Sequence, residues 1–193
     1  MHVVQRRSIV LWAAAALAAP GLVQAQSYPE HPVRFVVPYP PGGGTDVIAR
    51  IVQGKLQAAL GQNIVIDNKG GAGGSVGTDV VAKAPHDGYT VLFTLNSHTV
   101  NPAIYAKLPF DTLKDFEPVG TVASLPQILV ANPAFPANSV AELIALAKAK
   151  PGTLAYASVG VGSPGHLAGE LFKLRTGTQI THVPYRGGGP AVT

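Results

Sequence analysis

Glycine and proline occur in clusters between short apolar runs, and this arrangement constrains the fold more than any other feature of the sequence. The 193 residues include 22 glycines and 17 prolines. In the clearest case an apolar run at 33–37 ends in the cluster 38–44, and apolar residues then recur at helical spacing over 47–60. Such clusters mark tight turns between regular elements. Repetition of strand, glycine loop and helix predicts an α/β fold with parallel, doubly wound sheets.

The same pattern predicts further elements along the chain. Strands are expected at 33–37, 64–66, 89–93, 154–158 and 180–185, each bounded by turn residues. Helices are expected after the glycine clusters that end at 44 and 74, and after two serines further along the chain. The expected caps are Thr45 or Asp46 with Gly61 for the first helix, Ser139 with Glu142 as a capping box for the third, and Ser163 with Pro164 for the fourth.

Two consecutive extended runs, 119–123 and 127–131, interrupt the alternation of strands and helices. We interpret them as a crossing between two lobes, the first at 26–125 and the second at 126–193. The sequence stops soon after an expected strand, directly behind a glycine-proline cluster at 187–190. We therefore expect the second lobe to be truncated.

Residues 1–25 have the pattern of a signal peptide. Arg6 and Arg7 precede an apolar run at 9–19, which is too short to span a bilayer comfortably. Cleavage is expected after Ala25, and the protein is expected in the periplasm. The pattern fits a general or a twin-arginine export signal equally.

Composition excludes several classes of function. Removal of residues 1–25 takes away two of the 14 basic residues and no acid, which leaves 12 against 10 and a nearly neutral chain. A basic stripe with aromatic residues is absent from the sequence, so we expect no nucleic-acid partner. The chain has no cysteine, which excludes disulfides and thiolate metal sites. The six histidines are scattered, and we expect no metal and no cofactor.

Both halves of the sequence place a glycine loop and a hydroxyl residue directly before a helix, at 40–46 and at 160–166. Such loops present unpaired backbone N–H groups at the positive end of a helix, which is a site for anionic oxygen. Each loop alone is equally well explained as a connecting turn. The occurrence of one loop in each half favours a cleft that holds an anion.

Two enzyme classes remain as the alternative. Residues 160–165 match the dinucleotide fingerprint GxGxxG, but no acidic residue follows at the distance that would hold a ribose. Ser163 misses the nucleophile elbow GxSxG by one position, with His166 and His182 nearby and Glu170 as the only acid in order. We therefore expect a binding protein rather than an enzyme, with an α/β hydrolase or a nucleotide-dependent enzyme as the runner-up.

Several motifs in a fixed order resemble those of one family. They are Tyr28-Pro29, residues 36–46 (VVPYPPGGGTD), 67–74 (DNKGGAGG), 87–90 (DGYT), Asn101-Pro102, 114–116 (KDF), 139–143 (SVAEL), 162–163 with 166–170 (GS and HLAGE), and 182–185 (HVPY). Together they resemble the Bug-type receptors, the substrate-binding proteins of tripartite tricarboxylate transporters. The resemblance covers essentially the whole chain after residue 25.

The resemblance implies a two-lobed, Venus flytrap periplasmic-binding-protein fold that closes on a small carboxylate. The implied ligand is a di- or tricarboxylate, an acidic amino acid or an aromatic acid, delivered to a membrane permease by a monomeric receptor. The implied ligand-binding residues are Tyr39, Gly43, Gly44, Thr45, Asp46, Asn96, Ser97 and His98 on the first lobe, with Gly162, Ser163 and His166 on the second. Asp46 is expected to hold its loop rather than touch an anion, because two negative charges repel.

Overall fold

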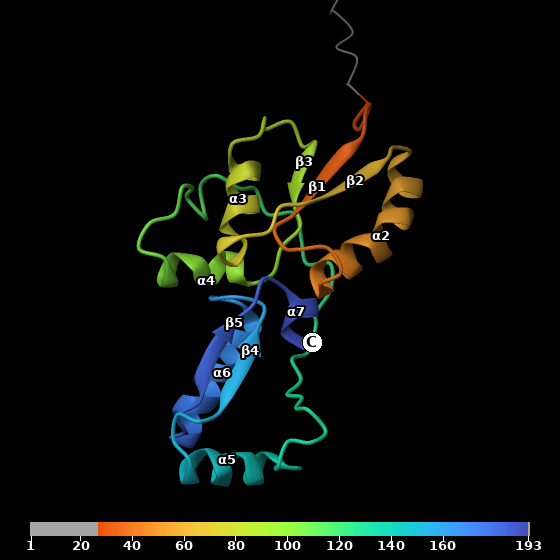
Figure 1. The fold of residues 1–193 in the computed structure, drawn as a ribbon. Helices are drawn as coiled ribbons and strands as arrows, with labels where there is room; N and C mark the ends of the chain where they lie inside the picture. Colours follow the sequence, from red (N-terminus) through yellow and green to blue (C-terminus); the bar gives the residue numbers. More distant parts are fainter. Residues whose placement is uncertain (1–26, 193) are drawn as a thin grey trace, which may run out of the picture. The chain divides into compact units, whose positions relative to one another are not determined.

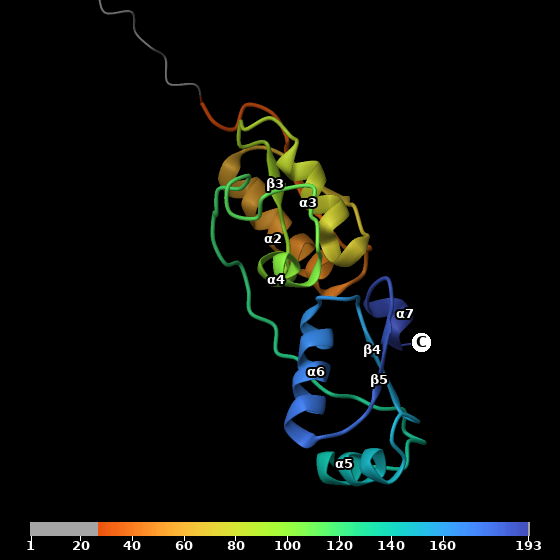
Figure 2. The same cartoon turned by 90° about the vertical axis from the view of Figure 1, so that its left-hand side faces the viewer.

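The computed structural model describes residues 27–192, shown from two directions in Figures 1 and 2. The expected signal peptide lies outside these residues. From His31 onward the chain forms one compact unit. Among the described residues no helix is both long and apolar enough to cross a bilayer.

The first sheet contains three parallel strands in the order β2-β1-β3 (Figure 1). They are β1 (Val33–Val37), β2 (Ile64–Asn68) and β3 (Thr90–Leu92). The central strand is apolar on both faces, and Val36 and Val37 are fully buried. A parallel strand covered by helices on both sides requires this composition.

Four helical elements accompany this sheet: α2 (Gly44–Leu60), η1 (Ala72–Gly74), α3 (Ser75–Ala82) and α4 (Ser97–Ile104). Figure 1 shows α2 and α3 on opposite sides of the three strands, which confirms the doubly wound arrangement. Gly61 ends α2 in the left-handed conformation with a φ of 68°, as predicted. The predicted cap at the other end is wrong, because Gly43 occupies the N-cap position and no side chain caps α2.

The second sheet pairs β4 (Ala155–Ser158) and β5 (Thr181–Pro184) in parallel. Its helices are α5 (Val140–Ala149), α6 (Pro164–Thr176) and α7 (Gly188–Val192). The oxygen of Ser139 accepts a hydrogen bond from the Glu142 amide, and that of Ser163 accepts one from the His166 amide, which confirms both predicted caps. The glycine-proline cluster at 187–190 leads into α7, which begins at Gly188.

The two extended runs at 119–123 and 127–131 form no strand in the structure. Their apolar side chains lie largely in solvent, with Val119 90% and Ile128 80% exposed. A run of apolar, β-branched residues becomes a strand only where a neighbouring strand supplies hydrogen bonds. No strand among residues 27–192 pairs with them.

Candidate functional site

The loop between β1 and α2 is held in shape by one buried carboxylate. Asp46 is 2% exposed. Its Oδ2 accepts hydrogen bonds from the Gly42 amide and from Nε of Arg50, both at 2.9 Å, and its Oδ1 accepts one from Nδ2 of Asn68 at 3.0 Å. These contacts, the Arg50 hydrogen bond foremost, lower the pKa of Asp46 from 3.8 to about 2. The carboxylate therefore remains charged and fixes the loop from inside the first turn of the helix.

The fixed loop leaves backbone donors at the start of α2. The first helical hydrogen bond runs from the Val47 amide to the Gly43 carbonyl at 3.0 Å. The amides of Gly44, Thr45 and Asp46 precede it, and none of them donates to an acceptor among residues 27–192. Three adjacent N–H groups at the positive end of a helix can donate hydrogen bonds to an anionic oxygen without a cationic side chain.

Tyr39 and Ser97 are brought together beside this loop. The Tyr39 hydroxyl contacts Oγ of Ser97 at hydrogen-bonding distance and lies 3.3 Å from Oγ1 of Thr94. Tyr39 and Ser97 are 8% and 1% exposed, so both hydroxyls are buried with their partners. Asn96 occupies the N-cap position of α4 and is exposed, with no side-chain cap bond. Direct ligand contact by these three residues stays a prediction.

His98 points into an aromatic cluster. Its ring centroid lies 4.9 Å from that of Phe116 in an edge-on contact and 6.2 Å from that of Phe110. Burial lowers the pKa of His98, while a hydrogen bond to the Thr112 backbone acts in the opposite direction. In this structure the neutral ring therefore packs the segment after α4 against the helix.

The second glycine loop offers fewer backbone donors than the first. Ser163 is the N-cap of α6, and its Oγ accepts from the His166 amide at 3.3 Å. The Gly162 amide donates to Nδ1 of His166 at 3.2 Å, so the protein itself occupies that donor. Pro164 has no N–H, which leaves the Gly165 amide as the one first-turn amide of α6 without an acceptor in the described chain. The two loops are therefore not equivalent, and the second depends on the Ser163 hydroxyl.

Two stacked histidines hold this second loop through hydrogen bonds. The rings of His166 and His182 stack with centroids 4.2 Å apart. Nε2 of His182 lies 2.6 Å from Oγ of Ser158, which in turn bonds both the amide and the carbonyl of Gly160. Burial lowers the pKa of His182, which keeps the ring neutral and able to take part in this bond. His166 thus fixes the Gly162 end of the loop directly, and His182 fixes the Gly160 end through Ser158.

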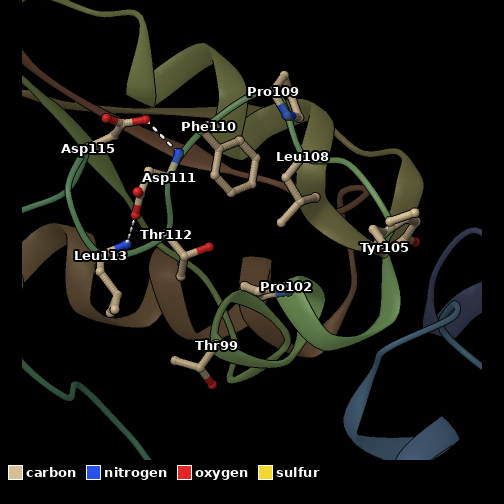
Figure 3. A pocket seen from close by; sticks show the side chains of 11 residues that line it. Thr99, Pro102, Tyr105, Leu108, Pro109, Phe110, Asp111, Thr112, Leu113 and Asp115 are labelled. Atoms are coloured by element: carbon tan, nitrogen blue, oxygen red, sulfur yellow. Dashed lines mark hydrogen bonds between the residues drawn. The ribbon is translucent and has the colours of Figure 1, made fainter.

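A groove of about 800 Å³ lies elsewhere, along α4 and the loop at 105–115 (Figure 3). None of the predicted site residues lines it. Figure 3 shows the carboxylates of Asp111 and Asp115 accepting the Leu113 and Asp111 amides, respectively. Hydrogen bonds from the Leu113 and Lys114 amides lower the pKa of Asp111. The two carboxyl side chains on the wall disfavour an anionic ligand in this groove.

The residues that suggested hydrolase chemistry do not form a triad. The Oγ of Ser163 accepts a helix amide, and its hydrogen bonds within the described chain include no histidine ring. Glu170 bonds the Tyr156 hydroxyl at 2.9 Å and Nζ of Lys173 at 2.8 Å. The described residues also hold no group of three metal-ligating side chains. The geometry around Ser163 is that of a helix cap rather than an activated nucleophile.

The sequence reasoning missed one residue that faces the second loop. Asn101 of α4 was noted only as part of a motif, yet its buried Oδ1 would lie 2.9 Å from a Cβ atom placed on Gly162. Its side-chain amide donates to the Gly73 carbonyl at 3.2 Å. Only the spatial proximity of 73, 101 and 162 identifies it, since these positions are far apart in sequence.

Comparison with known proteins connects this geometry to one family. The family model described as "Tripartite tricarboxylate transporter family receptor" matches residues 48–193. The protein BugT of Bordetella pertussis is 46% identical over 182 residues, which cover 93% of this chain and 55% of that protein. The chain spans about half the length of the relatives it matches.

Solved structures give the same result. The Rhodopseudomonas palustris protein Rpa4515, solved with adipate, is 40% identical with a TM-score of 0.81, over 86% of this chain and 56% of that chain. MatC of Rhodopseudomonas palustris, solved with bound malate, is 33% identical with a TM-score of 0.78 over the same shares of the two chains. The periplasmic binding protein BugD is 35% identical with a TM-score of 0.75, over 86% of this chain and 55% of that chain. The chain therefore belongs to the tripartite tricarboxylate transporter receptor family, the Bug-type solute-binding proteins, and its α/β fold is a truncated form of the family's periplasmic-binding-protein fold.

Proposed function

We propose that this chain is the ligand-capturing portion of a periplasmic receptor that binds a small dicarboxylate and transfers it to a membrane permease. Residues 26–125 and 126–193 serve as the two lobes of the receptor, which acts as a monomer and performs no chemistry on its ligand. The observation that supports this most is the row of amides at Gly44, Thr45 and Asp46, which find no acceptor within the described part of the chain and lie in a loop fixed by a buried carboxylate.

A carboxylate suits this row of donors better than a neutral ligand. Hydrogen bonds to a charged group contribute about 1.5 to 3 kcal/mol each, so three of them supply about 4.5 to 9 kcal/mol before the cost of association. Micromolar binding corresponds to roughly 8 kcal/mol, so contacts at both ends of the ligand are needed. The Ser163 hydroxyl accepts one bond from α6 and retains its proton for a ligand oxygen on the other side. Adipate and malate in the related structures are both dicarboxylates, which supports a ligand with an acidic group at each end.

The test is isothermal titration with adipate, malate and a tricarboxylate, using the parent chain and two cap variants. Ser163→Ala removes both a helix cap and the proposed ligand contact. We expect binding to weaken by about 1 to 3 kcal/mol, which raises the dissociation constant roughly 5- to 150-fold. Ser139→Ala removes the equivalent cap of α5 and serves as the matched control, since it should lower stability by about 1 kcal/mol without changing affinity.

Two results would contradict the proposal. Turnover of the added acid, or tight binding of a nucleotide, would indicate an enzyme. An equal dissociation constant for the parent and Ser163→Ala would remove Ser163 from the site. Fractionation of cells that express the gene tests the export prediction, with the mature protein expected in the periplasmic fraction and its first residue at Gln26.

A further inference from the structure

The second glycine loop lies against the first half of the chain so closely that two positions accept only glycine. A Cβ atom on Gly73 would lie 2.6 Å from the carbonyl oxygen of Val161 and 2.9 Å from the hydroxyl of Tyr105. A Cβ atom on Gly162 would lie 2.9 Å from Oδ1 of Asn101. Non-bonded carbon and oxygen atoms do not approach to this distance, so a side chain on Gly73 would push the two segments apart. A side chain on Gly162 would displace the buried Asn101 amide or push the segments apart in the same way.

Asn101 sits at the centre of this contact with a fixed orientation. The residue is 1% exposed, and its Nδ2 lies 3.2 Å from the Gly73 carbonyl and 3.4 Å from Oγ of Ser75. A carbonyl oxygen can only accept a hydrogen bond, so the Gly73 carbonyl determines which end of the amide faces it. Oδ1 consequently faces Gly162, where it is buried without a hydrogen-bond partner among residues 27–192.

An unpaired buried carbonyl is uncommon and is expected to have a functional reason. Gly162 faces this oxygen, but its amide donates to Nδ1 of His166 at 3.2 Å. Asn101 therefore packs against the loop without a hydrogen bond to it, and the Gly162 amide keeps its hydrogen bond to His166. A contact of this kind can separate again, because no hydrogen bond has to break between the two segments.

We propose that Gly73, Asn101 and Gly162 form a latch that sets how closely the loop bearing Ser163 approaches the half of the chain bearing the α2 amides. The latch sets the closest approach of the two anion-binding helix starts, and so selects the shortest diacid that can reach both. This second part rests on the proposed function, whereas the latch contact itself does not.

A distance measurement without any ligand tests the latch. The chain has no cysteine, so Lys55→Cys and Leu174→Cys, both exposed, place two spin labels on α2 and α6. Gly73→Ala should lengthen and broaden the measured distance distribution. Gly61→Ala is the matched control, because Gly61 has a φ of 68° against 61° for Gly73 but nothing within 4 Å of its Cβ position. The control carries the same backbone strain without the contact and should keep the parent distribution.

Gly162→Ala tests the same contact on the second glycine loop, and Gly152→Ala is its control. Their φ values are 78° and 72°, and Gly152 has open space around its Cβ position. A parent-like distribution in both Gly73→Ala and Gly162→Ala would overturn the latch. The latch would also be overturned if Gly61→Ala changed the distance distribution as Gly73→Ala does, or if Gly152→Ala changed it as Gly162→Ala does. Backbone strain rather than the contact would then be responsible.

Titration with succinate, glutarate and adipate tests the selection of ligand length. Gly73→Ala should raise the ratio of adipate to succinate affinity by about tenfold relative to the parent and to Gly61→Ala. An altered distance with an unaltered ratio would refute the length selection. If the parent bound none of these acids, the proposed function would fail, while the spin-label distances would still decide whether the latch exists.

Discussion

Replacement of Asp46 by asparagine tests whether one buried charge holds the first glycine loop. The substitution keeps the size of the side chain but removes the negative charge that accepts hydrogen bonds from Gly42, Arg50 and Asn68. The new amide also presents N–H atoms where one of these donors now points. We expect the loop to lose its fixed shape and the protein to lose stability.

The magnitude follows from the pKa of Asp46. A shift from 3.8 to about 2 corresponds to roughly 2 kcal/mol of preference for the charged form in the folded protein. Loss of one partner of a buried pair costs about 3 to 5 kcal/mol. Arg50 is half-exposed and can turn to solvent when its partner is removed, which favours the lower value. We therefore expect a decrease of about 2 to 3 kcal/mol in the free energy of unfolding.

The effect should depend on pH in a defined direction. Folding lowers the pKa of Asp46, so its contribution is complete above the unfolded-state pKa near 3.8 and disappears as the pH falls through about 2. The difference in stability between parent and Asp46→Asn should therefore be constant from neutral pH to about 4 and then shrink.

Urea unfolding followed by circular dichroism measures this difference. A loss of about 2 kcal/mol moves the midpoint by roughly 1 M urea for a protein of this size. Glu117→Gln is the control, because Glu117 is exposed and forms no hydrogen bond or ion pair within residues 27–192, so the change should alter stability by less than about 0.5 kcal/mol. Equal midpoints for the parent and Asp46→Asn, or a difference that persists unchanged at pH 2, would refute the role of the charge.

Two other predictions follow from packing and burial. Gly169→Ala should destabilise the protein by about 1 to 3 kcal/mol in the same urea assay, because its Cβ would lie 2.3 Å from the Tyr156 ring, whereas Gly54→Ala has open space and should stabilise α2 by about 0.5 to 1 kcal/mol. Similar effects of the two changes would show that the Tyr156 contact is unimportant. The His182 ring should titrate below 6.5 in an NMR pH series because it is buried, and a midpoint above that value would show that Ser158 and its surroundings do not hold it neutral.

The local elements of the fold could be predicted from the sequence because their signals are local. The apolar run at 33–37 became the buried central strand, and Ser139 and Ser163 cap their helices as their neighbours in sequence indicated. The ordered motifs along the chain identified the family, which the comparisons confirm. A cap or a turn depends on three or four adjacent residues, so one sequence contains the necessary information.

Burial and pairing were decided only by the tertiary structure. Ile51 lies on the apolar face predicted for α2, yet it is 65% exposed, and the run at 127–131 found no strand to pair with. Periodicity shows which residues share a face, but it does not show whether another element covers that face. The meeting of Gly73, Asn101 and Gly162 has the same origin, since contacts between distant segments arise only when the chain has folded.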